Sequence, residues 1–575
     1  MPIRPTPSDK RRGWGDQSVT RRQFVQGLAL GSAALSLGLH RGARAATPSL
    51  VSAPGVLSGS EFQLDIGTGR ANFTGRERAV IAVNGSLPAP VLRFREGDDI
   101  AITVRNALAD TTSIHWHGVL VPAAMDGVPG LSFAGIRPGE TFTYRFPVRQ
   151  AGTYWYHSHS GMQELQGLYG AIVIDPREPE PFAFDREHVV LLSDWTDDDP
   201  MRVFTNLRKQ SDYYNLHQRT VGDFFHDVRE KGWKSAWADR SMWGGMRMNP
   251  TDLADVTSPA FTCLVNGQSP AANWTGLFQP GEKVRLRFIN GAAMVFFDVR
   301  IPGLKMTVVA ADGQYVEPVD VDEFRLGGGE TLDVIVEPEN RPAYTIFAQN
   351  SDRTGYARAT LAQQPGLVAD VPTLDPRPVL TETDMGMDMA MMTSMPDMPL
   401  QTHPASERNN PGVDMQAMMP AARLDDPGVG LRDNGRVVLT YAALKSAFPD
   451  PDGREPTREI ELHLTGNMER YVWSIDGIPF NLATPVRLTY GERVRLTLVN
   501  DTMMAHPFHL HGMWSDLEDE DGNFQLRKHT ITIPPGTRRS YRVTADAPGR
   551  WAYHCHLFLH MAGGMMREVR VEGGA

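Results

Sequence analysis

The sequence predicts an all-β protein built from three tandem β-sandwich domains. One short pattern, a glycine-containing turn followed by an alternating strand that ends in Asn, occurs at residues 96–106, 280–290 and 490–500. Alternating apolar and polar residues indicate a half-buried strand, and repetition at this scale indicates tandem copies of one fold. The 54 glycines and 42 prolines among 575 residues also favour turn-rich β structure. A two-residue hairpin-type turn precedes each copy: Asn84-Gly85, Asn266-Gly267 and Asp476-Gly477.

Residues 1–45 read as an export signal and not as part of the fold. Basic residues precede Thr20-Arg-Arg-Gln-Phe-Val25, an apolar run extends from Leu28 to Leu39, and Ala43-Arg-Ala45 resembles a cleavage site. The arginine pair resembles a twin-arginine signal, which predicts delivery to the periplasm by the twin-arginine export machinery. Because the apolar run is too short to span a bilayer comfortably, we expect no stable membrane insertion after cleavage.

The charge balance is acidic. The whole chain has a formal net charge of −11, and residues 46–575 carry −17 because the leader holds eight basic and two acidic side chains. An acidic surface argues against nucleic acid as a partner and is compatible with a cationic substrate.

The first and third copies carry histidines that the middle copy lacks. Gly152–His159 is echoed by Gly549–His556, whereas the matching strand of the middle copy, Ala343–Asn350, has no histidine. We therefore expect the middle domain to be a spacer without metal ligands. Residues 194–255 have fewer strand signals and more helical character, which predicts a helical insertion in this second domain.

A methionine-rich stretch separates the second and third domains. Proline, aspartate and methionine dominate it and strand periodicity vanishes, which is typical of a linker or loop. Its methionines are Met385, Met387, Met389, Met391, Met392, Met395, Met398, Met415, Met418 and Met419. The predicted divisions of the chain are the signal peptide 1–45, domain 1 at 46–178, domain 2 at 179–365, the linker at 366–432 and domain 3 at 433–575.

Four His-x-His pairs are the candidate metal ligands. Residues i and i+2 of a strand point to the same face, so each pair presents two imidazoles to one place. Eight imidazoles are too many for one metal ion and suit a cluster. Neutral imidazole suits copper and zinc alike, but these pairs lack the nearby carboxylate that zinc hydrolases normally add. The pairs are His115 with His117, His157 with His159, His509 with His511, and His554 with His556.

Cys555 lies between the two histidines of the last pair, so its sulfur points to the opposite face of the strand. A thiolate, two imidazoles and a thioether define a blue-copper electron-transfer site. One strand would thus join a thiolate site to an imidazole site through a few bonds, which suits electron transfer. The other donors are His506, His560 and Met565; Met561 and Met566 lie nearby, and a plain core residue is the alternative for each.

We expect the remaining cysteine and histidines to have structural roles. Cys263 lies in an apolar strand at 261–265 and is expected to be a buried small hydrophobe, not a disulfide partner of Cys555. The other histidines lack paired spacing and are expected at the surface or in the core: His40, His188, His217, His226, His403, His463 and His529.

These motifs resemble the four copper signatures of the multicopper oxidases. The matching stretches are 115–118, 157–159, 506–512 and 554–565, and the likeness extends over essentially the whole mature chain. The leader, the methionine-rich stretch and Met242–Met248 resemble the bacterial periplasmic copper-resistance branch of that family. The resemblance implies three cupredoxin-like Greek-key β-sandwiches and four copper ions per chain.

The resemblance also implies a role for each ligand. Cys555 would pass electrons to His554 and His556. The type 1 copper would be held by His506, Cys555, His560 and Met565. The type 2 copper would be held by His115 and His509. One type 3 copper would be held by His117, His157 and His556, and the other by His159, His511 and His554.

Asp126, in the stretch 125–129, matches an acidic residue that the family places near the cluster. The resemblance implies that it relays protons, and an ordinary Asp-Gly turn is the alternative. Some relatives carry a second acid directly after the last type 1 histidine, where this chain has Met561.

The implied chemistry is one-electron oxidation of a substrate coupled to four-electron reduction of O2 to water. Thioether sulfur is soft and prefers Cu(I) to hard ions, so the methionine-rich stretch predicts Cu(I) as the substrate and copper resistance as the role. A laccase-like oxidase of phenols or aromatic amines, acting on another small reducing substrate, is the first alternative. A non-enzymatic copper-sequestering protein is the second, and the complete set of eight cluster histidines argues against it.

Overall fold

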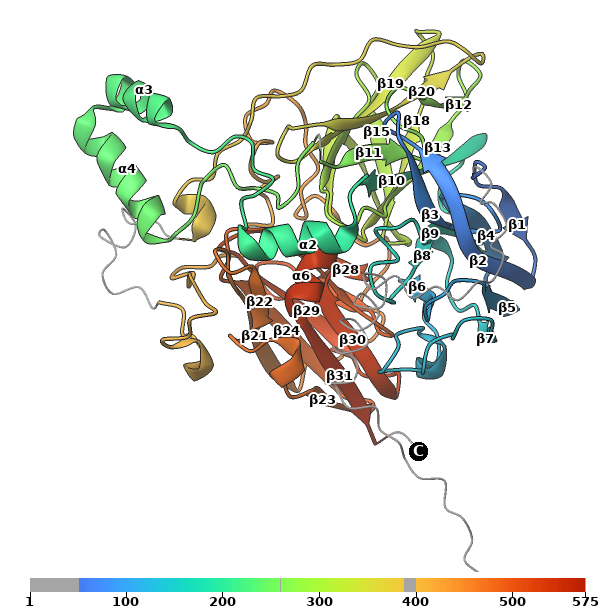
Figure 1. Ribbon diagram of the computed structural model, residues 1–575. Helices are drawn as coiled ribbons and strands as arrows, with labels where there is room; N and C mark the ends of the chain where they lie inside the picture. The colour runs from blue at the N-terminus through green and yellow to red at the C-terminus, as the bar shows by residue number, and fades with distance from the viewer. Residues whose placement is uncertain (1–50, 259, 387–399, 574–575) are drawn as a thin grey trace, which may run out of the picture.

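The computed structural model describes residues 51–258, 260–386 and 400–573. It has six β-sheets, two for each of three sandwiches, which Figure 1 colours blue to cyan, green to yellow, and orange to red along the chain. The predicted all-β class is confirmed. The leader, His40 and the methionines from Met387 to Met398 lie outside the described residues.

The first sandwich places its two histidine pairs at one sheet edge. Strand β6 is the edge strand, and it pairs with β8 so that His115 lies opposite His157. One sheet has the order β3 (Glu77–Val83), β2 (Glu61–Asn72), β5 (Asp99–Asn106), β7 (Thr141–Pro147). The other has the order β1 (Val56–Ser58), β4 (Ala89–Arg95), β9 (Tyr169–Asp175), β8 (Gly152–His157), β6 (His115–His117).

The second sandwich is buried along most of its strands, and its residues 343–350 form the fully buried strand β19. One sheet has the order β11 (Thr262–Val265), β10 (Arg186–Trp195), β13 (Val284–Asn290), β18 (Thr331–Val336), β15 (Met306–Ala311), β16 (Gln314–Val321). The other has the order β12 (Trp274–Leu277), β20 (Tyr356–Ala362), β19 (Ala343–Asn350), β14 (Phe297–Arg300), β17 (Glu323–Leu326).

The third sandwich repeats this plan. Strands β25 and β30 are neighbours and place His509 opposite His554. One sheet has the order β22 (Val472–Ile475), β21 (Arg458–Asn467), β24 (Arg493–Asn500), β29 (Arg538–Thr544), β26 (Ser515–Glu518), β27 (Phe524–Lys528). The other has the order β23 (Val486–Thr489), β31 (Met566–Glu572), β30 (Gly549–Cys555), β25 (His506–Leu510), β28 (Thr530–Ile533).

The repeated sequence pattern corresponds to one strand in each domain, namely β5, β13 and β24. The asparagine that ends each strand is fully buried and donates its amide to carbonyls of nearby loops, as Asn106 does to Asp110 and Ile136. Asn500 likewise binds the carbonyls of Met504 and Ile533. A buried amide satisfied in this way fixes the loop that leaves the strand, so the repeat encodes loop placement as well as a strand.

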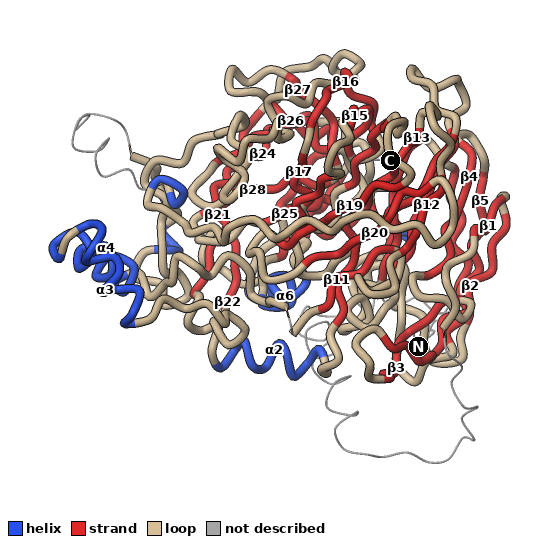
Figure 2. Tube along the Cα trace, turned by 90° about the horizontal axis from the view of Figure 1, so that it is seen from above, coloured by secondary structure: helices blue, strands red, loops and turns tan. Residues whose placement is uncertain are grey.

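The helices α2 (Pro200–Lys209), α3 (Val221–Lys231) and α4 (Trp233–Gly245) lie at the margin of the molecule (Figure 2). All three fall in the stretch where the sequence predicts helical character. Thr220 and Asp223 form a reciprocal capping box at the start of α3. The short α6 (Phe558–Gly563) follows β30. Among the described residues, no helix has the length and apolarity needed to cross a bilayer.

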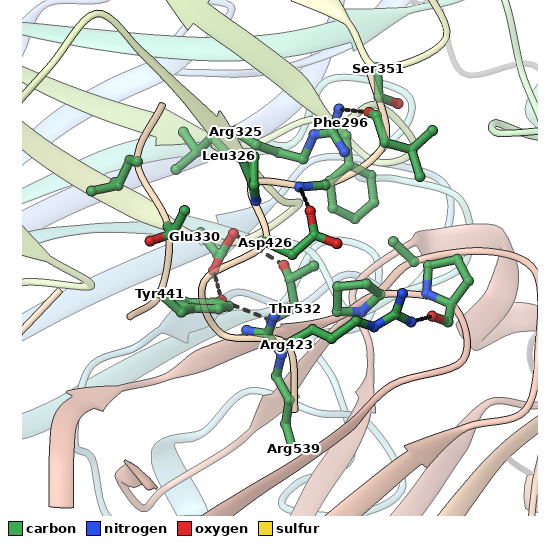
Figure 3. A pocket seen from close by; sticks show the side chains of 18 of the residues that line it. Phe296, Arg325, Leu326, Glu330, Ser351, Arg423, Asp426, Tyr441, Thr532 and Arg539 are labelled. Carbon is green, nitrogen blue, oxygen red and sulfur yellow. Dashed lines mark hydrogen bonds between the residues drawn. The ribbon is translucent and has the colours of Figure 1, made fainter. Parts of the chain in front are cut away.

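The connecting segment between β20 and β21 packs on both neighbouring domains. Its described part contains two short 3-10 helices, η2 (Thr383–Met385) and η3 (Ala405–Glu407), and no β-strand. It helps to enclose a cavity of about 140 Å³ between the second and third domains (Figure 3). There Tyr441 donates to Glu330 at 2.6 Å, and the buried Arg539 guanidinium lies 4.2 Å from the centre of the Tyr441 ring. Burial lowers the pKa of Arg539 to about 10.

Candidate metal centre

The four His-x-His pairs meet where the first and third sandwiches face each other. The rings of His115 and His511 stack with centroids 3.8 Å apart, and those of His117 and His509 stack at the same distance. Each stack joins a ring of the first domain to a ring of the third. His159, His511 and His556 lie just beyond the ends of their strands, so the strand alternation that the sequence suggested positions only part of the set.

The donor atoms of these histidines come together in overlapping groups of three. Within each group the candidate ligand atoms all lie within 4.8 Å of one another, and every member is buried. Among the described residues, such groups include His115, His117 and His509; His117, His157 and His556; His159, His511 and His554; and His115, His157 and His159.

Many of these ring nitrogens are buried without a hydrogen-bond partner in the described part of the chain. They include Nε2 of His115, His157 and His509, and Nδ1 of His117. A buried polar atom left unpaired is costly, and several such atoms aimed at one space are what metal ligands require. The donor set therefore fits metal ions that accept imidazole nitrogen.

Lowered pKa values favour the neutral form of seven of these imidazoles, which carries the free lone pair that a metal ion needs. Burial, followed by repulsion from neighbouring rings, lowers the pKa of His157, His509 and His511 well below the usual value. Burial also lowers the pKa of His554 to about 4.

A second layer of polar groups orients the rings. The Asp126 carboxylate lies 3.0 Å from Nδ1 of His511 and 3.2 Å from Nδ1 of His115, so one acid contacts a histidine of each domain. Glu164 lies 2.7 Å from Nδ1 of His157. A partner on one ring nitrogen fixes the ring and leaves the other nitrogen for the metal. No sequence spacing points to Glu164, because an isolated acid after a motif is common.

The position of Asp126 depends on the glycine that follows it. Gly127 has φ of +81°, and a Cβ at this residue would lie 1.8 Å from the carbonyl oxygen of Ile114. The backbone therefore bends at Asp126 in a way that requires glycine next, and this bend aims the carboxylate at the histidines.

The sulfur site lies one residue away, on the other face of β30. Cys555 Sγ is 3.4 Å from Nδ1 of His506 and 3.8 Å from Nδ1 of His560, and the two nitrogens are 3.1 Å apart. A point equidistant from these three atoms lies about 2 Å from each, which is close to a metal–imidazole bond length. Met565 is fully buried and its backbone bonds to His560 and Cys555.

The second ring nitrogen of each histidine in this site also has a hydrogen-bond partner. Nε2 of His560 contacts Asp255 at 2.6 Å, and Nε2 of His506 contacts the Thr502 hydroxyl at 2.7 Å. Tyr471 donates its hydroxyl to the same Asp255 oxygen at 2.9 Å. Asp255 comes from the second domain, so it is 305 residues from His560 in the chain and could not be found from motif spacing.

The two cysteines are free, as predicted, and both are buried. Cys263 packs in the core, where its thiol contacts Asn350. His529, His403 and His463 are buried or nearly so, as the prediction of surface or core positions allowed, but each has neighbours that the sequence did not indicate. His529 is a core residue, but its ring centroid is only 4.8 Å from that of His117. His403 and His463 lie together with ring centroids 4.9 Å apart.

Comparison with known proteins finds similar sequences along nearly the whole chain. Three multicopper oxidase family models match residues 65–179, 186–366 and 453–575. The chain is 59% identical to copper resistance protein A of Pseudomonas syringae pv. tomato, over 97% of this chain and 100% of the relative. It is 60% identical to copper resistance protein A of Escherichia coli, over 96% and 99%.

The fold comparison agrees. The solved structure of Fet3p, a multicopper oxidase that functions in iron import, matches with a TM-score of 0.64 at 21% identity, over 90% of this chain and 91% of that one. At this identity the likeness supports the three cupredoxin-like sandwiches and nothing finer. Together with the family models over all three sandwiches, these findings show that the chain belongs to the multicopper oxidase family, whose members bind type 1, type 2 and type 3 copper.

Proposed function

We propose that this multicopper oxidase oxidises Cu(I) to Cu(II) in the periplasm and reduces O2 to water. The observation that carries the proposal is the methionine-rich stretch, whose soft sulfur donors favour Cu(I). Relatives about 60% identical over nearly the whole chain are named for copper resistance, which supports the same substrate.

We further propose the ligand assignment made from the sequence. The type 1 copper belongs to His506, Cys555, His560 and Met565. The type 2 copper belongs to His115 and His509. The type 3 coppers belong to His117, His157 and His556, and to His159, His511 and His554. Two of the buried groups of three coincide with the proposed type 3 sets, and a third contains both type 2 ligands. Bound copper supplies one-electron redox chemistry and the centre at which O2 is reduced. The proposed domain limits remain 46–178, 179–365 and 433–575, with 366–432 as the linker.

The chain offers a short route between the two sites. Cys555 is bonded directly to His554 and His556, so a thiolate ligand and two cluster ligands share three consecutive residues. The Cys555 carbonyl also contacts Nδ1 of His554 at 2.9 Å. An electron that enters at the sulfur therefore has covalent and hydrogen-bonded paths of a few bonds to the cluster.

The side of the type 1 site that faces the second domain carries candidate substrate contacts. Arg247, in the methionine-bearing stretch 242–248, pairs with Glu469 at 3.0 Å. Glu469 lies in the turn that leads to Tyr471, which bonds to Asp255. The ring of Tyr471 lies 6.2 Å from that of His560, centroid to centroid, so a cationic substrate held beside the stretch 242–248 would deliver its electron through this side of the site.

Replacing Asp255 with Asn tests whether this carboxylate tunes the type 1 site. Loss of the negative charge beside His560 should disfavour the oxidised metal and raise the type 1 reduction potential. A rise of about 60 mV corresponds to about tenfold in the equilibrium constant. Redox titration of the visible absorption measures the shift.

Asp252→Asn is the matched control. Burial and the nearby Asp255 raise the pKa of Asp252 well above its usual range. Because this favours the neutral form of Asp252, its replacement by Asn should leave the type 1 reduction potential unchanged. Equal potentials in wild type and Asp255→Asn would contradict the role of Asp255.

Asp126 is proposed to hold and deliver protons at the cluster. Burial raises the pKa of its carboxyl, so protonation costs less there than in water. General acid and base groups contribute about 10²- to 10⁴-fold, and we expect Asp126→Asn to lower kcat for O2 consumption by about 10²-fold. Because Asp126 also orients His115 and His511, the copper content must be measured. An unchanged kcat at full copper content would rule out the relay, and the exposed Asp110→Asn serves as control.

The methionine run is tested by conversion to leucine, which keeps the apolar bulk and removes the sulfur. The residues to change are Met387, Met389, Met391, Met392, Met395 and Met398. We expect kcat/KM for Cu(I) to fall about tenfold or more and the rate with a bulky phenol to stay unchanged. Parallel assays of O2 uptake with the two substrates measure this. Equal loss with both, or no loss, would favour the laccase-like alternative.

Export is tested at the leader. A twin-arginine signal depends on its arginine pair, so Arg21→Lys with Arg22→Lys should leave the precursor in the cytoplasm, as measured by cell fractionation. Arg11→Lys with Arg12→Lys changes a neighbouring pair and should not affect export. Periplasmic mature protein from the first variant would contradict the proposed route.

A further inference from the structure

A second group of metal-type ligands lies away from the copper sites. His403 and Glu407 come from the connecting segment, at either end of η3, while His463 comes from β21 and Asp501 from the loop after β24. Nδ1 of His403 is 3.2 Å from Asp501 Oδ2 and 3.3 Å from Glu407 Oε2. Nδ1 of His463 is 2.7 Å from the same Asp501 oxygen and 3.9 Å from Glu407 Oε1.

These spacings suit a bound ion. Four donors placed tetrahedrally at a metal–imidazole bond length would lie about 3.3 Å apart, in the middle of the observed range. Two carboxylates and two neutral imidazoles also balance the charge of a divalent ion, which matters because a buried charge must be compensated.

The group is buried and incompletely satisfied. The side chains of His463, Glu407 and Asp501 are at most 1% exposed, and that of His403 is 12% exposed. Both ring nitrogens of His403 and the Oε1 atom of Glu407 find no partner with hydrogen-bond geometry among the described residues. An unpaired carboxylate oxygen aimed into a buried cluster is costly, and a metal ion would satisfy it.

Three of the ligand side chains also have partners outside the cluster. Nε2 of His463 contacts Glu461 at 3.2 Å, the histidine–carboxylate arrangement usual around metal ions. Asp501 Oδ1 accepts from the Ala417 backbone at 2.7 Å, and Glu407 Oε2 accepts from the Gln416 amide at 3.0 Å. The ligand atoms that face the cluster are thereby left for one centre.

We propose that His403, Glu407, His463 and Asp501 bind one divalent transition-metal ion, Zn²⁺ or Cu²⁺, separate from the four coppers of the oxidase. Imidazole and carboxylate donors suit both ions, and Cu²⁺ binds such donors more tightly. The ion would clamp the connecting segment to the third domain. Asp501 precedes Thr502, whose hydroxyl contacts His506, so the clamp is one residue from a partner of the sulfur site.

The competing interpretation is that no metal ion binds, and that a protonated His403 forms salt bridges with Asp501 and Glu407 instead. Burial opposes a charge on His403, but the approach of Asp501 and Glu407 outweighs it and raises its pKa to about 10. Metal-free protein would then hold protons where the ion binds, and binding would expel them.

The test is a metal titration of the copper-loaded enzyme against a chromophoric chelator. Zn²⁺ is the first probe because thioethers bind it poorly, so the methionine run contributes little. We expect one Zn²⁺ per wild-type chain, and more than about tenfold weaker binding in His403→Gln and in Glu407→Gln, since even outer-partner changes cost 10- to 100-fold. Cu²⁺ should compete with Zn²⁺ for the same site.

His226→Gln is the matched control, because His226 also has a glutamate four residues on, Glu230, but its side chain is 67% exposed. Zinc binding should not change in this variant. The visible absorption of the type 1 site reports whether each variant is folded. Anomalous diffraction from zinc-soaked wild-type crystals gives an answer that needs no variant. A zinc peak among the four side chains would support the site. Absence of that peak, or equal affinity in all variants, would overturn it and leave a salt bridge only.

Discussion

The fold is organised around a group of imidazoles that are buried, neutral and short of hydrogen-bond partners. Removing such groups from water costs free energy that the sandwiches must supply. Metal ions recover that cost, because each unpaired nitrogen becomes a ligand. Donors from the first and third domains share this space, as the stacks of His115 on His511 and His117 on His509 show. Copper binding therefore favours the docking of these two domains.

The middle domain is more than the spacer that its missing histidines suggested. Asp312, in the turn between β15 and β16, accepts from the backbone of His529 and Thr530, and the Thr530 hydroxyl contacts Nε2 of His117. The same domain presents Asp255 to His560. Gly329 has no room for a side chain, because a Cβ would lie within 3.0 Å of His556 and His117. This domain thus orients ligands that its neighbours provide.

The sequence predicted the fold class and identified the eight paired histidines and the residues of the sulfur site as candidate metal ligands. It could do so because strand alternation, repeated turns and His-x-His spacing are local patterns. It did not find Glu164 or Asp255, and it did not predict that His403 and His463 lie together. Those contacts join residues that are far apart in the chain or lie in irregular segments, where no periodicity constrains which side chains meet. The strand argument also failed for His159, His511 and His556, which lie past strand ends.

The two halves of the imidazole cluster lie almost 400 positions apart in the printed sequence, between His115 and His509. During synthesis the first half leaves the ribosome long before the second exists. A redox-active, oxygen-reducing core therefore cannot be completed on a nascent chain. Assembly of the cluster is therefore a late event that can only follow synthesis of the third domain.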